Sequence, residues 1–221
     1  MNYELFETTE STQELSKVEI LEDGVIREKL GTPLESGWDD QQETVIGTPE
    51  EADDHWHRQT EMNSCAVACQ EFVAEQLLER EFSEQEMIEY AKARDWYDPA
   101  EGTSITDMGN LLEAVGLQVE RVENLAISDL AMSLAEGEKV ICGVNNMILQ
   151  EPSLVDLPGI DANHAVEVIG IDYNDPCNPV VILNDPGVEN GQGIRHDMDV
   201  FMDAWKTSNY FAVIASRMEA A

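Results

Sequence analysis

Apolar residues in the middle of the chain recur at the spacing of a helix. Between Ala66 and Leu77 they stand three or four positions apart, which predicts a helix over 65–80. Asn63 and Ser64 precede this stretch, and both residue types commonly cap helix N-termini. The predicted helix therefore begins at Cys65.

The same reasoning places further elements along the chain. The predicted helices cover 83–93, which opens with the capping box Ser83-Glu84-Gln85-Glu86, 103–114, 128–135 and 200–205. Apolar runs rich in β-branched residues predict strands over 117–122, 139–144, 164–171, 180–183 and 210–215. Helices thus dominate the first half and antiparallel strands the second, which is an α+β layout.

The first part of the chain has a different character. Residues 1–50 are acidic and polar, and a Gly-Thr-Pro turn occurs at 31–33 and again at 47–49. Apolar residues in this part are clustered and not periodic. We expect a separate N-terminal segment that is a short hairpin, a flexible leader or a propeptide-like arm over a cleft. Residues 51–221 are expected to form one domain.

Charge restricts the classes of partner. The chain carries 12 basic and 46 acidic side chains, a net charge of −34. Such a surface repels the phosphate backbone of nucleic acids and anionic membranes, so we expect neither as a partner. It suits a cationic partner or bound divalent cations, or it is only a solvated acidic surface. The N-terminus lacks a basic and apolar secretory signal, and no apolar run is long enough to span a bilayer. The expected location is therefore cytoplasmic.

The four cysteines are expected to be free thiols. Cys65 and Cys69 stand four residues apart, one turn along the predicted helix, which is a poor arrangement for a disulfide. A chain of 221 residues also needs no disulfide to hold its core. Cys69 and Cys142 are expected in the core, and Cys177 lies in an expected turn.

Cys65 is the candidate nucleophile. The unpaired amides at a helix N-terminus favour negative charge, which lowers the pKa of a thiol there. A cysteine nucleophile also needs an imidazole to accept its proton and a third group to orient that imidazole. A cysteine at a helix start is often only structural, so the catalytic interpretation depends on finding these partners.

The predicted strands contain candidates for the imidazole and for the group that orients it. His164 opens the strand over 164–171, and Asn184 and Asp185 end the next one. If the two strands pair as a hairpin, His164 lies beside both residues, and either could orient the imidazole. Gln59 stands six residues before Cys65, so its side-chain amide and the Cys65 backbone amide could form an oxyanion hole.

These motifs resemble a known group of enzymes. The segment Gln59-Thr60-Glu61-Met62-Asn63-Ser64-Cys65 resembles the glutamine-to-cysteine segment of papain-like cysteine peptidases. It is most similar to that of the C39-like group, which is related to peptidases that process bacteriocin leaders. Asn163-His164-Ala165-Val166 is similar to the histidine strand of that group, and Leu183-Asn184-Asp185-Pro186-Gly187 to the strand of its third residue.

The resemblance implies a papain-like fold, with the cysteine on a helix start in the N-terminal half and an antiparallel sheet in the C-terminal half. It implies hydrolysis of a peptide or protein substrate through an acyl-enzyme, with Asp185 preferred over Asn184 as the orienting residue. The acidic surface would favour basic substrates. One departure is that Ala66 and Val67 stand where the group usually has Gly-Pro.

Other functions remain open from sequence. The same scaffold could carry another thiol acyl-transfer enzyme, such as a transglutaminase-like enzyme or an amidase. It could also be a non-catalytic acidic module that captures a cationic peptide. His55 and His57 lie near the cysteine, but their spacing matches no tight zinc motif, and we expect neither a metal nor a cofactor.

Overall fold

A computed structural model describes residues 44–218, and its centre is an antiparallel sheet. Seven strands form this sheet within the described range, in the order β2-β7-β3-β4-β5-β6, with β1 added beside β4. Their bounds are β1 Val45–Gly47, β2 Gln118–Val122, β3 Lys139–Val144, β4 His164–Asp172, β5 Val180–Asn184, β6 Ile194–Asp197 and β7 Ala212–Ser216.

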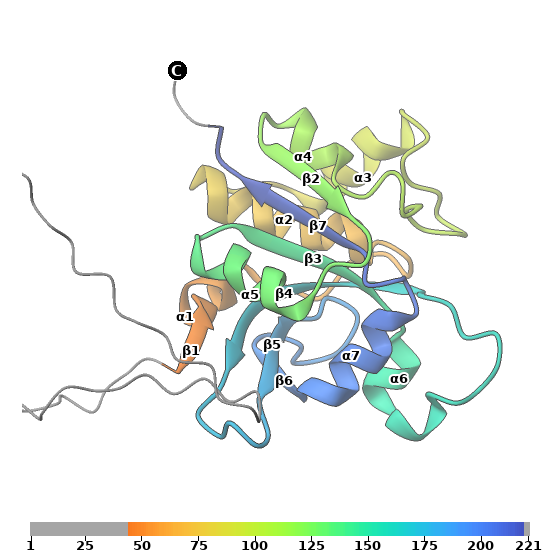
Figure 1. Cartoon of the computed structure of the whole chain (residues 1–221). Helices are drawn as coiled ribbons and strands as arrows, with labels where there is room; N and C mark the ends of the chain where they lie inside the picture. The colour runs from red at the N-terminus through yellow and green to blue at the C-terminus, as the bar shows by residue number, and fades with distance from the viewer. Residues whose placement is uncertain (1–43, 219–221) are drawn as a thin grey trace, which may run out of the picture. The chain divides into compact units, whose positions relative to one another are not determined.

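Helices cover both faces of the sheet (Figure 1). One face packs against α2 and α4, and the other against α5, α6 and α7. The helices are α1 Pro49–Ala52, α2 Cys65–Leu78, α3 Glu84–Lys92, α4 Asn110–Ala114, α5 Ile127–Ala135, α6 Asn146–Gln150 and α7 Met198–Lys206, with short 3₁₀ turns at η1 Asp53–His55 and η2 Pro152–Leu154. The predicted α+β class is confirmed.

Strand β4 organises the sheet because it pairs along both of its edges. On one edge, β3 pairs with its first half and β1 with its second half; β5 occupies the other edge. The expected N-terminal segment is described only from residue 44, and the rest of it lies outside the described residues. Strand β1, which precedes residue 50, pairs with β4 of the central sheet.

The expected helix over 103–114 is wrong in its first half, where the chain forms turns and α4 begins only at Asn110. Gly109 has a φ of +94°, a left-handed conformation that starts no regular helix. The buried side chain of Gln70 on α2 accepts hydrogen bonds from the backbone amides of Gly109 (2.9 Å) and Leu111 (3.1 Å). A side chain from another helix therefore sets where α4 starts.

The other predicted elements are present with ends shifted by a few residues, while β1, α1, α6, β6 and the two 3₁₀ turns were not predicted. All of these unpredicted elements are short, with at most five residues each, so a periodic apolar pattern has little room to appear in them. None of the helices in residues 44–218 is both long enough and apolar enough to cross a membrane.

Candidate active site

Helix α2 begins at Cys65, as the sequence predicts. Ser64 occupies the N-cap position, but its side chain does not cap the helix, which differs from our expectation. The Ser64 hydroxyl instead donates to Oε1 of Glu84 at 2.6 Å. The amides of the first turn of α2 are thus not used by a capping side chain, and the Cys65 thiol is a free, partly exposed group beside them.

Pairing of β4 with β5 brings His164 and Asp185 together. The strands are antiparallel, with Glu167 opposite Asn184, so the chain that continues past Asn184 runs back toward the start of β4. Nε2 of His164 lies 2.6 Å from Oδ1 of Asp185. The side chains of the pair are 6% and 0% exposed, so little water competes for this hydrogen bond.

Cys65 and His164 line the same cavity, and each side chain shifts the pKa of the other. Burial by itself would lower the pKa of His164, but the interactions with Asp185 and Cys65 outweigh it and raise that pKa to about 10. Burial would likewise raise the pKa of Cys65, yet His164 and the backbone of Ala165 and Ala66 bring it below the ordinary value. The two shifts favour a thiolate–imidazolium pair at neutral pH.

A cavity of about 360 Å³ gives access to this pair, because both Cys65 and His164 lie in its wall. The other thiols in the described range are placed differently. Cys69 and Cys142 are fully buried, and burial raises the pKa of each; Cys177 is exposed in a turn. Of the four, Cys65 alone combines a lowered pKa with a place on the cavity.

Three neighbours that the sequence analysis did not assign hold Asp185 in place. Oδ1 of Asp185 accepts a second hydrogen bond from the Gly187 amide (2.8 Å), and its carbonyl accepts one from Nε1 of Trp56 (2.8 Å). The Asp185 amide donates to the carbonyl of Gly191 (2.8 Å). A Cβ at Gly187 would lie 2.7 Å from Cε1 of His164, so only glycine fits beside the ring.

Asn184 is turned away from His164, which argues against it as the orienting residue. Its Nδ2 donates to the carbonyl of Ala52 and to Oε2 of Glu167, both at 3.0 Å, and its Oδ1 accepts from the Gly193 amide. Successive residues of a strand point to opposite faces, so Asn184 and Asp185 could not both face His164.

Gln59 lies in the wall of the same cavity as Cys65. Its Nε2 donates to the carbonyls of Glu61 and Met62, both at 2.8 Å, and its backbone amide donates to the carbonyl of Pro186 (2.9 Å). The carboxamide therefore lies in the same cavity wall as Cys65 but is bonded to its own loop. Its part in an oxyanion hole remains a prediction.

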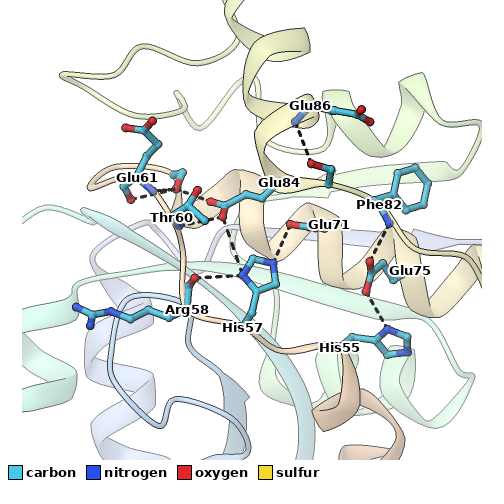
Figure 2. A network of polar contacts seen from close by, with 12 residues as sticks. His55, His57, Arg58, Thr60, Glu61, Glu71, Glu75, Phe82, Glu84 and Glu86 are labelled. Carbon is cyan, nitrogen blue, oxygen red and sulfur yellow. Dashed lines mark hydrogen bonds and ion pairs between the residues drawn. The ribbon is translucent and has the colours of Figure 1, made fainter.

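His55 and His57 pair with two glutamates of α2 (Figure 2). Nδ1 of His55 lies 3.1 Å from Oε2 of Glu75, and Nε2 of His57 lies 2.9 Å from Oε2 of Glu71. The two histidines are two residues apart in extended chain, a span of about 6.6 Å, and the two glutamates are four residues apart in a helix, a span of about 6 Å. The spacing of the histidines therefore matches that of the glutamates. His57, Glu71 and Glu84 offer ligand atoms within 4.8 Å of one another, but the hydrogen bond from His57 to Glu71 already accounts for that cluster.

No protein-family model matches the chain. Uncharacterized proteins of Mycobacterium tuberculosis (strain H37Rv) and Mycobacterium bovis are 28% identical to it over 201 residues, which cover 78% of this chain and 85% of each relative.

Solved structures show a clearer likeness. A protein of Bacillus anthracis assigned to the C39-like peptidases superposes with a TM-score of 0.59 at 12% identity, over 80% of this chain and 99% of that one. The peptidase domain of Streptococcus ComA, a bifunctional ABC transporter of a quorum-sensing pathway, has a TM-score of 0.50 at 15% identity, over 74% and 98%.

A double-glycine-motif protease from an AMS/PCAT transporter, solved with its leader peptide, has a TM-score of 0.52 at 15% identity, over 74% of this chain and 91% of that one. The chain therefore has the fold of C39-like peptidases, and the expected resemblance is confirmed at the level of the fold.

Proposed function

We propose that the protein is a cysteine peptidase in which Cys65 is the nucleophile, His164 the general base and acid, and Asp185 the residue that orients the imidazole. The observation that carries this proposal is the buried hydrogen bond between Asp185 and His164 at a cavity whose wall holds both His164 and Cys65. These groups are the parts that acyl transfer by a thiol requires.

The chemistry follows the positions of these groups. The Cys65 thiolate attacks the carbonyl carbon of the scissile peptide bond, and a C–S bond forms as the carbonyl oxygen becomes an oxyanion. The imidazolium of His164 gives its proton to the amine nitrogen, the C–N bond breaks, and the amine leaves. A thioester between the substrate acyl group and Cys65 remains.

Water completes the cycle. His164 takes a proton from a water molecule whose oxygen attacks the thioester carbonyl, a C–O bond forms, and the C–S bond breaks to release a carboxylic acid. The oxyanion of both steps would accept from the backbone amide of Cys65. For Gln59 to donate as well, its Nε2 would have to exchange one of the loop carbonyls of Glu61 and Met62 for the oxyanion.

A peptide is the substrate that the surroundings of the cavity favour. Met62, Ile105 and Met147, which are 89%, 40% and 48% exposed, all line it, although they come from three separate segments. Exposed apolar side chains at a cavity suit the side chains of a bound peptide. A structurally similar protease was solved with a leader peptide bound, and the net charge of −34 favours basic peptides.

Alkylation by iodoacetamide tests the proposal without knowledge of the substrate. At pH 7 an ordinary thiol is only a few per cent ionised, so we expect the peptide that contains Cys65 to be labelled at least tenfold faster than N-acetylcysteine. His164→Ala should remove most of that advantage. Equal rates for Cys65 and N-acetylcysteine, unchanged in His164→Ala, would refute the proposed mechanism.

A peptide library then separates hydrolysis from other acyl transfer. We expect cleaved peptides with the wild-type chain and none with Cys65→Ala. Transfer of the acyl group to an added amine, without hydrolysis, would instead indicate a transglutaminase-like enzyme. Binding of basic peptides that persists in Cys65→Ala, with no cleavage by the wild type, would indicate a binding module.

A further inference from the structure

Glu84 is a buried carboxylate that contacts the loop before the nucleophile. It is the first residue of α3, and only 4% of it is exposed. Its Oε2 accepts from the backbone amide of Thr60 at 2.9 Å (Figure 2). Its Oε1 accepts from the hydroxyl of Ser64 at 2.6 Å. Both oxygens therefore bind the same short loop.

That loop carries two of the groups assigned to the reaction. Gln59, the expected oxyanion donor, directly precedes Thr60, and Cys65 directly follows Ser64. Ser64 is completely buried, so no water competes for its hydroxyl, whose other contacts are with the carbonyl (3.0 Å) and the amide (3.2 Å) of Glu61 in the same loop. The two hydrogen bonds of Glu84 thus fix the loop at the residues adjacent to both functional groups.

A carboxylate this deeply buried needs a nearby cation, since an uncompensated charge costs several kcal/mol. His57 supplies it. Its Nδ1 lies 4.0 Å from Oε2 of Glu84, its Nε2 lies 2.9 Å from Oε2 of Glu71, and its ring packs edge-on against Phe72 with the ring centres 5.1 Å apart. The imidazole therefore links the carboxylate on α3 to α2, the helix that begins with the nucleophile.

We propose that Glu84 is a positioning residue for the nucleophile: its carboxylate, balanced by His57, holds Thr60 and Ser64 so that Gln59 and Cys65 keep their places at the cavity. This inference rests on the proposed function, because it assigns a role relative to Cys65. Glu84 acts through the loop and contacts no reacting atom.

Glu75 provides a matched control. Its carboxylate also accepts from a histidine ring, His55 (3.1 Å), and from a backbone amide, that of Phe82 (2.8 Å). Like Glu84, it ties a segment before α2 to the α3 region. Its two partners lie outside the loop from Gln59 to Cys65, so its loss should affect stability without moving the nucleophile.

The experiment compares Glu84→Ala, Glu84→Gln and Glu75→Ala in the full chain with Cys177→Ser, which removes the exposed competing thiol. The rate constant for alkylation of Cys65 by iodoacetamide is measured from pH 5 to 10, together with the unfolding temperature. We expect Glu84→Ala to lower the plateau rate by about tenfold, because displacement of reacting groups by about 1 Å has effects of this order or larger. Glu75→Ala should stay within about twofold of the wild type.

Glu84→Gln is the conservative variant and should recover most of the rate. Its carboxamide oxygen can accept from Thr60, and the Ser64 hydroxyl can rotate to accept from the carboxamide nitrogen. Equal plateau rates in Glu84→Ala and Glu75→Ala, or a rate in Glu84→Gln as low as in Glu84→Ala, would overturn the inference.

Ser64→Ala is the second variant if Glu84→Ala does not fold, since it deletes the hydroxyl that joins Glu84 to the loop, together with the contacts of that hydroxyl to Glu61. We expect a slower plateau rate there too, and an unchanged rate would overturn the inference. A wild-type Cys65 no faster than N-acetylcysteine would refute the proposed function itself. If Cys65 is alkylated rapidly in the wild type and equally rapidly in the Glu84 and Ser64 variants, only the positioning role is refuted.

Discussion

Nε2 of His164 lies 2.6 Å from a carboxylate oxygen of Asp185, in a contact almost closed to solvent. This hydrogen bond occupies one ring nitrogen and so determines which nitrogen remains to interact with the thiol. With Nε2 donating to Asp185, Nδ1 is the nitrogen left for Cys65. The Asp185 interaction favours the protonated form of the ring, and in the proposed mechanism Asp185 would also orient it.

The first prediction concerns the charge of Asp185. Asp185→Asn keeps the shape and an acceptor oxygen but removes the negative charge that helps raise the pKa of His164 to about 10. Without that charge the imidazolium is less favoured, so the titration midpoint of His164 should fall by about one pH unit or more. NMR of the histidine ring protons, assigned with a His164 variant, measures it.

Asn184→Ala is the control for this prediction. Asn184 is also buried beside the same strand end, but its contacts are with Ala52, Glu167 and Gly193. Its loss should lower the unfolding temperature and leave the His164 midpoint within a few tenths of a unit. A midpoint that moved equally in both variants would mean that general loosening, and not the Asp185 charge, controls the ring.

Gly187→Ala is predicted to displace the His164 ring. The added Cβ would lie 2.7 Å from Cε1 of His164 and 3.3 Å from Oδ1 of Asp185, so one of the two must move. We expect Cys65 alkylation at pH 7 to slow by about tenfold or more. Gly116→Ala is the control: its φ of +94° makes alanine strained, yet nothing lies within 4 Å. It should cost stability and leave the alkylation rate unchanged.

Much of the site could be predicted because it depends on local rules. A helix start after two polar capping residues placed Cys65, and the antiparallel pairing of neighbouring strands placed His164 beside the end of β5. Alternation of side chains along a strand could also have excluded either Asn184 or Asp185, since only one can face the imidazole. Which of them does depends on register, including the irregularity between Val168 and Gly170.

The remaining features depend on contacts between distant residues. The Ser64 hydroxyl has a good local position for capping α2, yet it binds Glu84, 20 residues later. Gln70 sets the start of α4 from 39 residues away. His55 and His57 pair with glutamates of α2 only because an extended segment runs along that helix. Such partners carry no signal at fixed spacing, so a single sequence does not reveal them.

The third prediction concerns Glu167, a fully buried carboxyl group on β4. Burial, partly offset by hydrogen bonds from Asn184 and Gln76, raises its pKa to about 7. The folded state therefore binds this proton more tightly than the unfolded state does. Its contribution to stability is complete below the ordinary carboxyl pKa of about 4.5 and is lost as the pH rises through about 7.

Glu167→Gln replaces the carboxyl group with an amide that does not titrate. The variant should therefore lose the decrease in the free energy of unfolding that titration of Glu167 causes. Urea denaturation at intervals between pH 4.5 and 8 measures it, with Glu120→Gln, an exposed position on β2, as the control. We expect the stability of the variant relative to the wild type to increase over this window. A constant difference across the window would contradict the assignment.

The last prediction concerns His57, whose imidazole faces the carboxylates of Glu71 and Glu84 and the carbonyl of Arg58. The hydrogen bond to Glu71 is the main cause that raises its pKa to about 9, against partial burial, which lowers it. The folded state holds this proton more tightly, so the contribution to stability is complete below about pH 6.5. It is lost as the pH rises through about 9.

His57→Gln should therefore be less stable than the wild type near pH 6, and the deficit should shrink as the pH rises toward 10. Subtracting the two curves cancels the titration of groups that the variants share, including the Cys65–His164 pair. His55→Gln makes the same chemical change one helical turn away, at the Glu75 pair, and serves as the control. The stability deficit of His57→Gln could instead stay constant or grow with pH. The imidazole would then contribute through its packing against Phe72 and not through the charge of its ring.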